Sequence, residues 1–267
     1  MSALGGGFDP RRYWEQRLAK PDITSVGYLS LGRSYNRWLY RLRRRIFLRE
    51  ARRLRSSWAG CSVLDVGSGT GVYVSLWAEV GASVTASDLT QASVDALAAS
   101  QPEIPAVLMD ITEPPSLRPG SFDAISAFDV LFHIVDDDRY ARALEHIARL
   151  LKDGAYFLFS DNFVHTATVR AEHQVSRPLA ETEAQLASLG LEIVRRRPMF
   201  IVMNAPLDAP GRIHRLYWSA LERLLARVPQ LGAVVGMSLY PVETLLVSIF
   251  RESPSTELMV CRKREAN

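Results

Sequence analysis

The sequence predicts an α/β fold with a largely parallel sheet, and three observations carry that prediction. An apolar run at residues 63–66 ends in a glycine-rich turn and is followed by a helical segment at 72–80, which makes a strand, loop and helix unit. Strands and helices continue to alternate as far as residue 160. Apolar residues make up 48% of the 267 residues, enough for one large α/β domain with additional segments or for two small domains.

Two helices are predicted ahead of this unit. Residues 10–18 favour a short helix, and residues 33–55 carry aromatic and aliphatic side chains at helical spacing. The second helix contains ten arginines and one acid, Glu50, so it has a strongly basic face. Such a face is either solvated, while the apolar stripe packs on the domain, or it attracts an anionic substrate or a membrane surface.

The glycine-rich turn reads Asp65-Val66-Gly67-Ser68-Gly69-Thr70-Gly71. Glycines let a ligand lie against bare backbone N–H groups at the start of a helix, so a nucleotide-like ligand is expected. The alternative is a turn that only packs the helix closely on the sheet. The spacing differs from the dinucleotide pattern G-x-G-x-x-G, and the acid before the first glycine suits a ligand with a positive amino group. The pattern resembles motif I of the class I methyltransferases, which use S-adenosylmethionine. This resemblance assigns cofactor binding to Asp65, Gly67, Ser68, Gly69 and Gly71.

Two later strands each end in an acid followed by an aliphatic residue. The strand at 83–88 ends in Asp88, before Leu89, and the next strand ends in Asp110, before Ile111. A carboxylate at the end of the second strand of such units accepts hydrogen bonds from ribose hydroxyls, so we expect Asp88 to bind the ribose and Leu89 to pack on adenine. The resemblance implies that Asp110 and Ile111 contact the amine and the ring of adenine. Acids at strand ends are also common helix caps.

The fourth strand, 122–128, ends at Phe128, where the family presents the methyl group to its substrate. It continues into a segment that resembles the superfamily's xVLxHi motif and contains His133. His133 is the first candidate for a base that takes the proton of an acceptor hydroxyl, and a structural or cofactor-proximal role is its alternative. His165, after the fifth strand, is the second candidate. Tyr28 is a candidate residue of a lid over the cofactor, and core packing is its alternative.

The last strands of the sheet are expected at residues 191–202 and 256–262. About fifty residues separate them, with two apolar-rich helical stretches at 212–227 and 231–250. No stretch is expected to be long enough to span a membrane. We therefore expect the two helical stretches to wall a large apolar acceptor pocket, together with the segment near Tyr28, although simple core packing is the alternative.

The resemblance implies a doubly wound, seven-stranded, mostly parallel sheet in the order 3-2-1-4-5-7-6, with strand 7 antiparallel. It also implies a helical N-terminal lid, and the spacing places a helical insertion between strands 6 and 7. The expected division of the chain is a lid segment at 1–57, a methyltransferase core at 58–204 and 255–267, and a helical cap at 205–254.

The sequence thus predicts an S-adenosylmethionine-dependent methyltransferase for a small or amphiphilic molecule, acting by O-methylation of a hydroxyl in an in-line displacement with base assistance. One alternative is carbon methylation of a prenyl or polyketide substrate, and another is a non-catalytic module that binds the cofactor. The loop spacing disfavours a nicotinamide-dependent dehydrogenase. No Asp/Asn-Pro-Pro-aromatic tetrapeptide follows the fourth strand, which disfavours a nucleic-acid substrate. A lipid-like substrate and peripheral contact with a membrane stay open.

Composition favours a cytoplasmic protein. Residues 1–9 lack the apolar core of a signal peptide. The two cysteines, Cys61 and Cys261, each stand at the edge of an expected strand, as small buried hydrophobic residues do. The acids at 136–138 are expected to begin a helix, where they complement its dipole, and no metal site is predicted.

Overall fold

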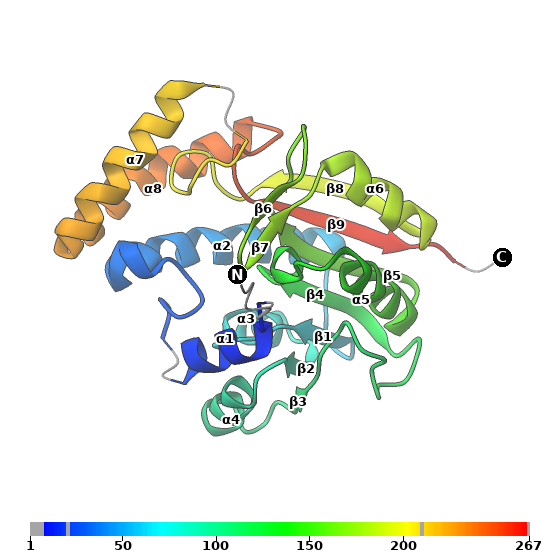
Figure 1. Cartoon of the computed structure of the whole chain (residues 1–267). Coiled ribbons are helices and arrows are strands. Elements are labelled where there is room, and N and C mark those ends of the chain that lie inside the picture. Colours follow the sequence, from blue (N-terminus) through cyan, green and yellow to red (C-terminus); the bar gives the residue numbers. More distant parts are fainter. Residues whose placement is uncertain (1–7, 20–21, 209–210, 266–267) are drawn as a thin grey trace, which may run out of the picture.

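A seven-stranded sheet with helices on both faces forms the centre of the molecule (Figure 1). The computed structural model describes residues 8–19, 22–208 and 211–265. Most of the N-terminal segment considered for a signal peptide, residues 1–7, lies outside the described residues.

The strands of the central sheet follow the order β3-β2-β1-β4-β5-β9-β8. The first five are parallel, and β9 runs antiparallel to both of its neighbours, β5 and β8. The expected order is confirmed, with β8 and β9 as the sixth and seventh strands. A separate hairpin, β6–β7, shifts the numbering and was not predicted. The strands are β1 Ser62–Val66, β2 Ser83–Asp88, β3 Ala106–Leu108, β4 Phe122–Phe128, β5 Leu151–Asp161, β6 Val169–Ala171, β7 Gln174–Ser176, β8 Leu191–Pro198 and β9 Glu257–Lys263.

The helices agree closely with those expected from apolar spacing. The basic helix is α2, the helix after the glycine-rich turn is α3, and the insertion forms α7 and α8. Three short 3₁₀ turns, η1 Leu29–Leu31, η2 Leu131–His133 and η3 Pro229–Leu231, join some of the elements. The helices are α1 Pro10–Leu18, α2 Gly32–Leu54, α3 Val72–Glu79, α4 Gln91–Ser100, α5 Asp137–Leu150, α6 Leu179–Ser188, α7 Arg212–Arg227 and α8 Gly232–Ile249.

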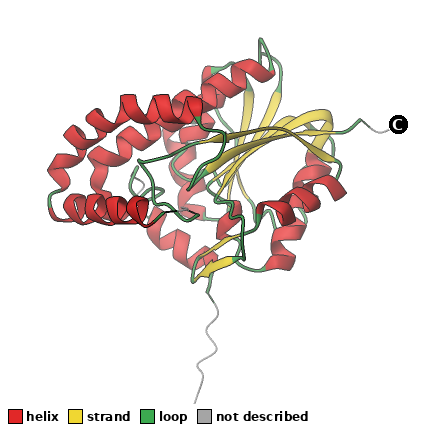
Figure 2. Cartoon of the chain, turned by 90° about the horizontal axis from the view of Figure 1, so that it is seen from above, coloured by secondary structure: helices red, strands yellow, loops and turns green. Residues whose placement is uncertain are grey.

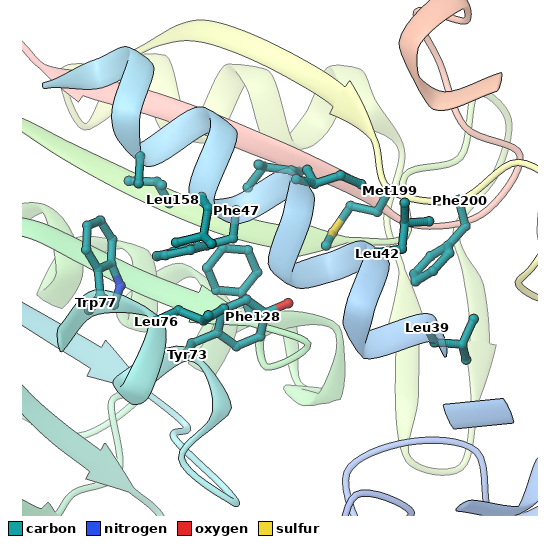
Figure 3. Packing of buried hydrophobic residues seen from close by; sticks show 14 of the residues in the cluster. Leu39, Leu42, Phe47, Tyr73, Leu76, Trp77, Phe128, Leu158, Met199 and Phe200 are labelled. Atoms are coloured by element: carbon teal, nitrogen blue, oxygen red, sulfur yellow. The ribbon is translucent and has the colours of Figure 1, made fainter. Parts of the chain in front are cut away.

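Alternate side chains of the strands supply two cores, one on each face of the sheet. Val63 of β1 belongs to the cluster covered by α2 and α3, while its neighbour Leu64 belongs to the cluster covered by α5 and α6. Figure 3 shows the first cluster, in which Phe47 of α2 packs between Trp77 of α3 and Phe128 of β4. Because Phe128 ends β4, this packing fixes α2 beside the carboxyl ends of the strands.

The insertion packs on α2 and not on the sheet edge. α7 and α8 lie beyond α2 in Figure 1, and Figure 2 shows helices gathered on one side of the molecule with the sheet beside them. The expected continuation of the sixth strand to residue 202 is wrong, because the chain turns after Pro198. The backbone N–H groups of Ile201, Val202 and Met203 donate to the buried carboxylate of Glu243 on α8, which draws this segment away from the ladder.

The expectation that no segment is long enough to cross a membrane is also wrong. η3 and α8 form one helical segment, Pro229–Ile249, whose 21 residues are long and apolar enough by length and composition alone. The stretch expected at 231–250 is therefore one continuous helical segment that runs through Pro241. Only 22% of its most apolar window is buried.

Candidate active site

A cavity of about 330 Å³ lies at the carboxyl ends of β1, β2 and β4. Ligands of open α/β sheets bind at this edge, where the strand order changes direction. Residues of α1 and Tyr40 of α2 also line the cavity. Most of the residues that the sequence assigned to the site line it, namely Gly67, Ser68, Gly69, Asp88, Leu89, Asp110, Ile111, Phe128 and His133.

The floor of the cavity is the glycine-rich loop between β1 and α3. Gly67 has a φ of +67° and Gly69 a φ of +51°, both in the left-handed region that side chains disfavour. A Cβ on Gly67 would lie 2.4 Å from the side chain of Val130, which also lines the cavity. Gly71, with a φ of +79°, precedes α3 at its N-cap and lies outside the lining. The loop therefore brings bare backbone to the cavity at the start of a helix.

Asp88 braces this loop as well as lining the cavity. One of its oxygens accepts a hydrogen bond from the N–H of Gly69 at 2.8 Å. The other oxygen accepts from the N–H of Thr90 at 2.9 Å and from its hydroxyl at 2.7 Å. A carboxylate offers about four lone-pair positions, so one acceptor position is left for a ligand. Asp88 thus lines the cavity, where the sequence led us to expect it, while its bracing of the loop was not predicted.

Asp110 is held in a similar way at the neighbouring strand end. Its Oδ1 accepts from the N–H and the hydroxyl of Thr112, and its Oδ2 pairs with Arg139 of α5 at 2.7 Å. Arg139 lines the cavity too, although no motif in the sequence singled it out. The aliphatic Ile111 and Leu89 flank the two carboxylates, so this end of the cavity combines hydrogen-bond acceptors with apolar surface.

Asp65 does not line the cavity. Its carboxylate is buried beneath the loop, where the hydroxyl of Ser126 donates to it and the indole of Trp77 donates to Ser126 in turn. Burial raises the pKa of Asp65 to about 7. The structure therefore places this residue in the support of β1 and β4, outside the lining of the cavity.

The roof of the cavity comes from the N-terminal segment. Trp14 and Leu18 of α1 line it, with Val26 from the following loop and Tyr40 from α2. The hydroxyl of Tyr40 donates to the backbone oxygen of Val26 at 3.1 Å, which ties the loop to α2. Tyr28 lies outside the lining and packs on Trp218 of α7 instead, with ring centroids 6.0 Å apart.

His133 lies at the side of the cavity, just after β4. Its Nδ1 is 2.8 Å from the backbone oxygen of His173, which can only accept, so Nδ1 carries the proton and Nε2 keeps its lone pair. Burial lowers the pKa of His133 to about 4, so the imidazole is neutral at physiological pH. The edge of Trp14 packs on the ring at 4.8 Å between centroids. His173 belongs to the turn between β6 and β7, the hairpin that sequence reasoning missed.

His165 lies elsewhere. It does not line the cavity, and 46% of its side-chain surface is exposed. Its Nδ1 is 2.6 Å from Asp208, and that hydrogen bond raises the pKa of His165. These contacts give His165 a role in holding two surface loops together.

A partly buried ion pair borders the cavity beside Phe128. Asp129 has a φ of +58°, which is rare for a residue with a side chain, and its carboxylate pairs with Arg43 of α2 at 2.5 Å. The hydroxyl of Ser160, at the end of β5, donates to the same carboxylate at 2.8 Å. Sequence reasoning could not single out Arg43 among the ten arginines of its region. The sequence did offer one signal for this pair, because Asp129 is an acid that directly follows the fourth strand.

The expected acceptor pocket between the insertion and Tyr28 is wrong. None of the described residues of α7 and α8 lines the cavity. Tyr35, near Tyr28, is also a core residue, whose hydroxyl donates to the backbone oxygen of Met203. The insertion packs on α2 and on the segment around Met203. The roof of the cavity is therefore formed by α1, Val26 and Tyr40.

Comparison with known proteins connects this geometry to a family. Residues 64–159 match the family described as a methyltransferase domain. The ubiquinone biosynthesis O-methyltransferase of Albidiferax ferrireducens is 35% identical over 107 residues, which cover 38% of this chain and 41% of the relative. The protein of the same name from Chromobacterium violaceum is 29% identical over 160 residues, covering 51% and 68%. The chain thus spans about two fifths of the length of several of these relatives.

Solved structures share the fold at low sequence identity. The [4+2]-cyclase SpnF aligns over 83% of this chain and 81% of its own, with a TM-score of 0.57 and 16% identity. A phosphoethanolamine N-methyltransferase of Haemonchus contortus, in complex with S-adenosyl-L-methionine, aligns over 83% of this chain and 53% of its own, with a TM-score of 0.54 and 18% identity. Residues 64–159 thus match a methyltransferase domain, and the solved structures share the fold of this chain with its open, mostly parallel sheet.

Proposed function

We propose that this chain is an S-adenosylmethionine-dependent methyltransferase that methylates a hydroxyl oxygen of a small or amphiphilic molecule. The observation that carries the proposal is the cavity itself. Its floor is the glycine loop, Asp88 and Asp110 stand at one end, and a neutral histidine stands at its side. The relatives named above are O-methyltransferases by name, which supports the same reaction class.

The residues of the cavity fit a nucleoside. Gly67 and Gly69 bring bare backbone to the cavity, and an added Cβ on either would crowd Val130 or Val26, which line the cavity as well. Asp88 offers its remaining acceptor position to ribose hydroxyls, and Asp110 stands next to the apolar surface that an adenine ring needs. The cofactor would supply a methyl group on a sulfonium, which is transferred in an in-line displacement.

The chain's own part in the reaction is to hold an acceptor in line and to receive its proton. Aligning two reactants in near-attack geometry is worth about 7–11 kcal/mol. Nε2 of His133 keeps a lone pair because the carbonyl of His173 fixes the proton on Nδ1. A hydroxyl that donates to Nε2 becomes a better nucleophile as the proton leaves, and such assistance is worth about 10²- to 10⁴-fold in rate.

The low pKa of His133 makes it a weak but constantly available base. It is neutral at any pH well above about 4, so no protonation step removes it from the reaction at neutral pH. A base with a low pKa suits an acidic hydroxyl better than an aliphatic alcohol. Transfer of the proton from the hydroxyl to the imidazole then costs less free energy. We therefore favour a phenol-like or enol-like hydroxyl in the acceptor.

The proposal extends to an amphiphilic acceptor and to peripheral contact with a membrane. The relatives are named for ubiquinone biosynthesis, and α8 turns a largely apolar surface outward. Carbon methylation and cofactor binding without chemistry are the competing outcomes of the test below.

The test is a mass-spectrometric screen. The purified chain and S-adenosylmethionine are incubated with separate aqueous and lipid extracts of the host, and new products heavier by one methylene are sought. The proposal predicts a product from the lipid extract whose added methyl is removed by ether cleavage. A methyl that resists ether cleavage would move the reaction to carbon, and the absence of any product despite cofactor binding would leave a binding module.

A further inference from the structure

The helical insertion presents an apolar face that no described residue covers. Four large apolar residues along α8 each expose between 55 and 63% of their surface. Their spacing puts them on one side of the helix. An exposed apolar stripe of this length is unusual on a monomeric protein and marks a contact surface. The residues, called the α8 stripe below, are Val234, Met237, Leu245 and Ile249.

The opposite side of α8 is fixed to the body of the protein. Gly232 and Gly236 lie one turn apart and let the helix approach α2 closely. A Cβ on Gly232 would lie 3.0 Å from the backbone nitrogen of Tyr35, and one on Gly236 would lie 2.2 Å from Trp38. Close approach through small residues holds two helices rigidly. The α8 stripe therefore points away from the protein in a fixed orientation.

Glu243 shows that α8 does not act as a membrane span. Its carboxylate is fully buried and accepts from the N–H groups of Ile201, Val202 and Met203 at 2.7, 2.9 and 3.1 Å. Leaving the protein for a bilayer would break all three hydrogen bonds and place a carboxylate in hydrocarbon. A helix that is anchored on one side and apolar on the other lies flat at an interface.

A row of arginines on α2 runs beside the α8 stripe. Arg41, Arg45 and Arg49 are spaced by four residues and are all exposed. Arg41 stacks over Trp38 and over Tyr240 of α8, which fixes the row next to that helix. Among the described ion pairs, no carboxylate reaches Arg45 or Arg49.

A groove of about 260 Å³ joins the two features. Arg45 and Arg49 form its α2 side, and Pro241, Thr244 and Leu245 contribute to its α8 side. The groove thus places two uncompensated positive charges against apolar surface, which is the pattern that an acidic headgroup with an acyl chain matches.

We propose that the α8 stripe and the groove beside it form a docking surface for a bilayer that contains anionic phospholipid. The stripe enters the boundary between headgroups and acyl chains, and Arg45 and Arg49 bind lipid phosphates. Basic residues near such a surface contribute about 1 kcal/mol each. This proposal uses no part of the methyl-transfer cavity, so it stands or falls apart from the proposed reaction.

Charge distinguishes this occupant from two others. A symmetric pair of chains joined through this face would bring two identical arginine rows together, and the described residues that line the groove include no acid to compensate them. A nucleic acid would match the arginines but would gain nothing from the uncharged stripe. A bilayer with acidic headgroups satisfies both features.

The test is co-flotation of the full chain with vesicles, without cofactor or acceptor. Vesicles of phosphatidylcholine alone are compared with an equal mixture of phosphatidylcholine and phosphatidylglycerol. The proposal predicts binding to the mixture that weakens with added salt. Arg45→Gln/Arg49→Gln should weaken it roughly thirty-fold, the factor for two arginines at about 1 kcal/mol each. Leu245→Gln/Ile249→Gln should abolish it.

Matched controls separate the site from general charge and polarity. Arg118→Gln/Arg149→Gln removes two exposed arginines from other surfaces, and Val194→Gln changes an exposed apolar residue of β8. Both should bind like the unmodified chain, and thermal unfolding should be the same for all variants. Equal loss in the controls, equal binding to both kinds of vesicle, or no flotation would overturn the proposal. So would self-association that Leu245→Gln/Ile249→Gln removes, because the stripe would then belong to a second copy.

Discussion

Replacing Gly67 by alanine tests whether the loop needs bare backbone at that point. The left-handed conformation at a φ of +67° costs a residue with a Cβ about 1–2 kcal/mol. The added Cβ would also lie 2.4 Å from Val130, and such overpacking typically costs a further ~1–3 kcal/mol. We therefore expect Gly67→Ala to lower the free energy of unfolding by about 2–5 kcal/mol and to weaken the binding of S-adenosylhomocysteine, because both residues line the cavity.

Two further variants divide this effect into its parts. Gly120 has a φ of +60° and nothing within 4 Å of an added Cβ, so Gly120→Ala measures the backbone cost alone. Val130→Ala in the Gly67→Ala background removes the collision and should recover the second part. Urea unfolding gives the stabilities, and calorimetry gives the affinity. The reasoning is refuted if Gly67→Ala is no more destabilising than Gly120→Ala and leaves the affinity unchanged.

Three other predictions concern single carboxylates and the histidine. Asp88→Ala should weaken cofactor binding by about 1.5–3 kcal/mol in calorimetry, since it removes a charged acceptor and the brace of Gly69; an unchanged affinity would exclude it from the site. His133→Ala should lower the turnover rate by about 10²- to 10⁴-fold with little change in cofactor affinity. The rate of the unmodified chain should stay level from pH 8 to pH 5.5, because His133 becomes protonated only as the pH falls toward its pKa of about 4. A rate that falls through pH 6.5 would contradict this. Asp65 has a folded pKa raised from 3.8 to about 7, so its burial destabilises the fold increasingly as pH rises between those values; Asp65→Asn should gain stability relative to the unmodified chain over that range, and a constant difference in melting temperature would contradict it.

The parts of the fold that were predictable from the sequence are those with local signals. Three alternating glycines after an apolar run, and an acid at the end of each of the next two strands, placed the cavity and its floor. The strand order came from a family resemblance that these motifs carried. The helices of the insertion were visible as apolar spacing, and α7 has the predicted bounds.

The parts that sequence reasoning missed depend on contacts between distant residues. The hairpin β6–β7 is short and its first strand is exposed, so no alternation of apolar and polar residues predicts it. Its turn nevertheless supplies the backbone carbonyl that orients His133. The turn after Pro198 forms because Glu243, about forty residues later, collects three N–H groups. The position of Asp65 is decided by Ser126 on the neighbouring strand. The identity of a residue and of its sequence neighbours does not reveal such contacts between distant residues.

Hydrogen exchange of the chain with and without S-adenosylhomocysteine tests whether the cofactor occupies the cavity at the strand ends. We expect slower exchange in three places that line the cavity: the loop at 67–70, the strand ends at 88–89 and 109–112, and the α1 roof around Trp14. Exchange in α7 and α8 should not change. Binding without protection of the glycine loop, or protection confined to the insertion, would contradict the account.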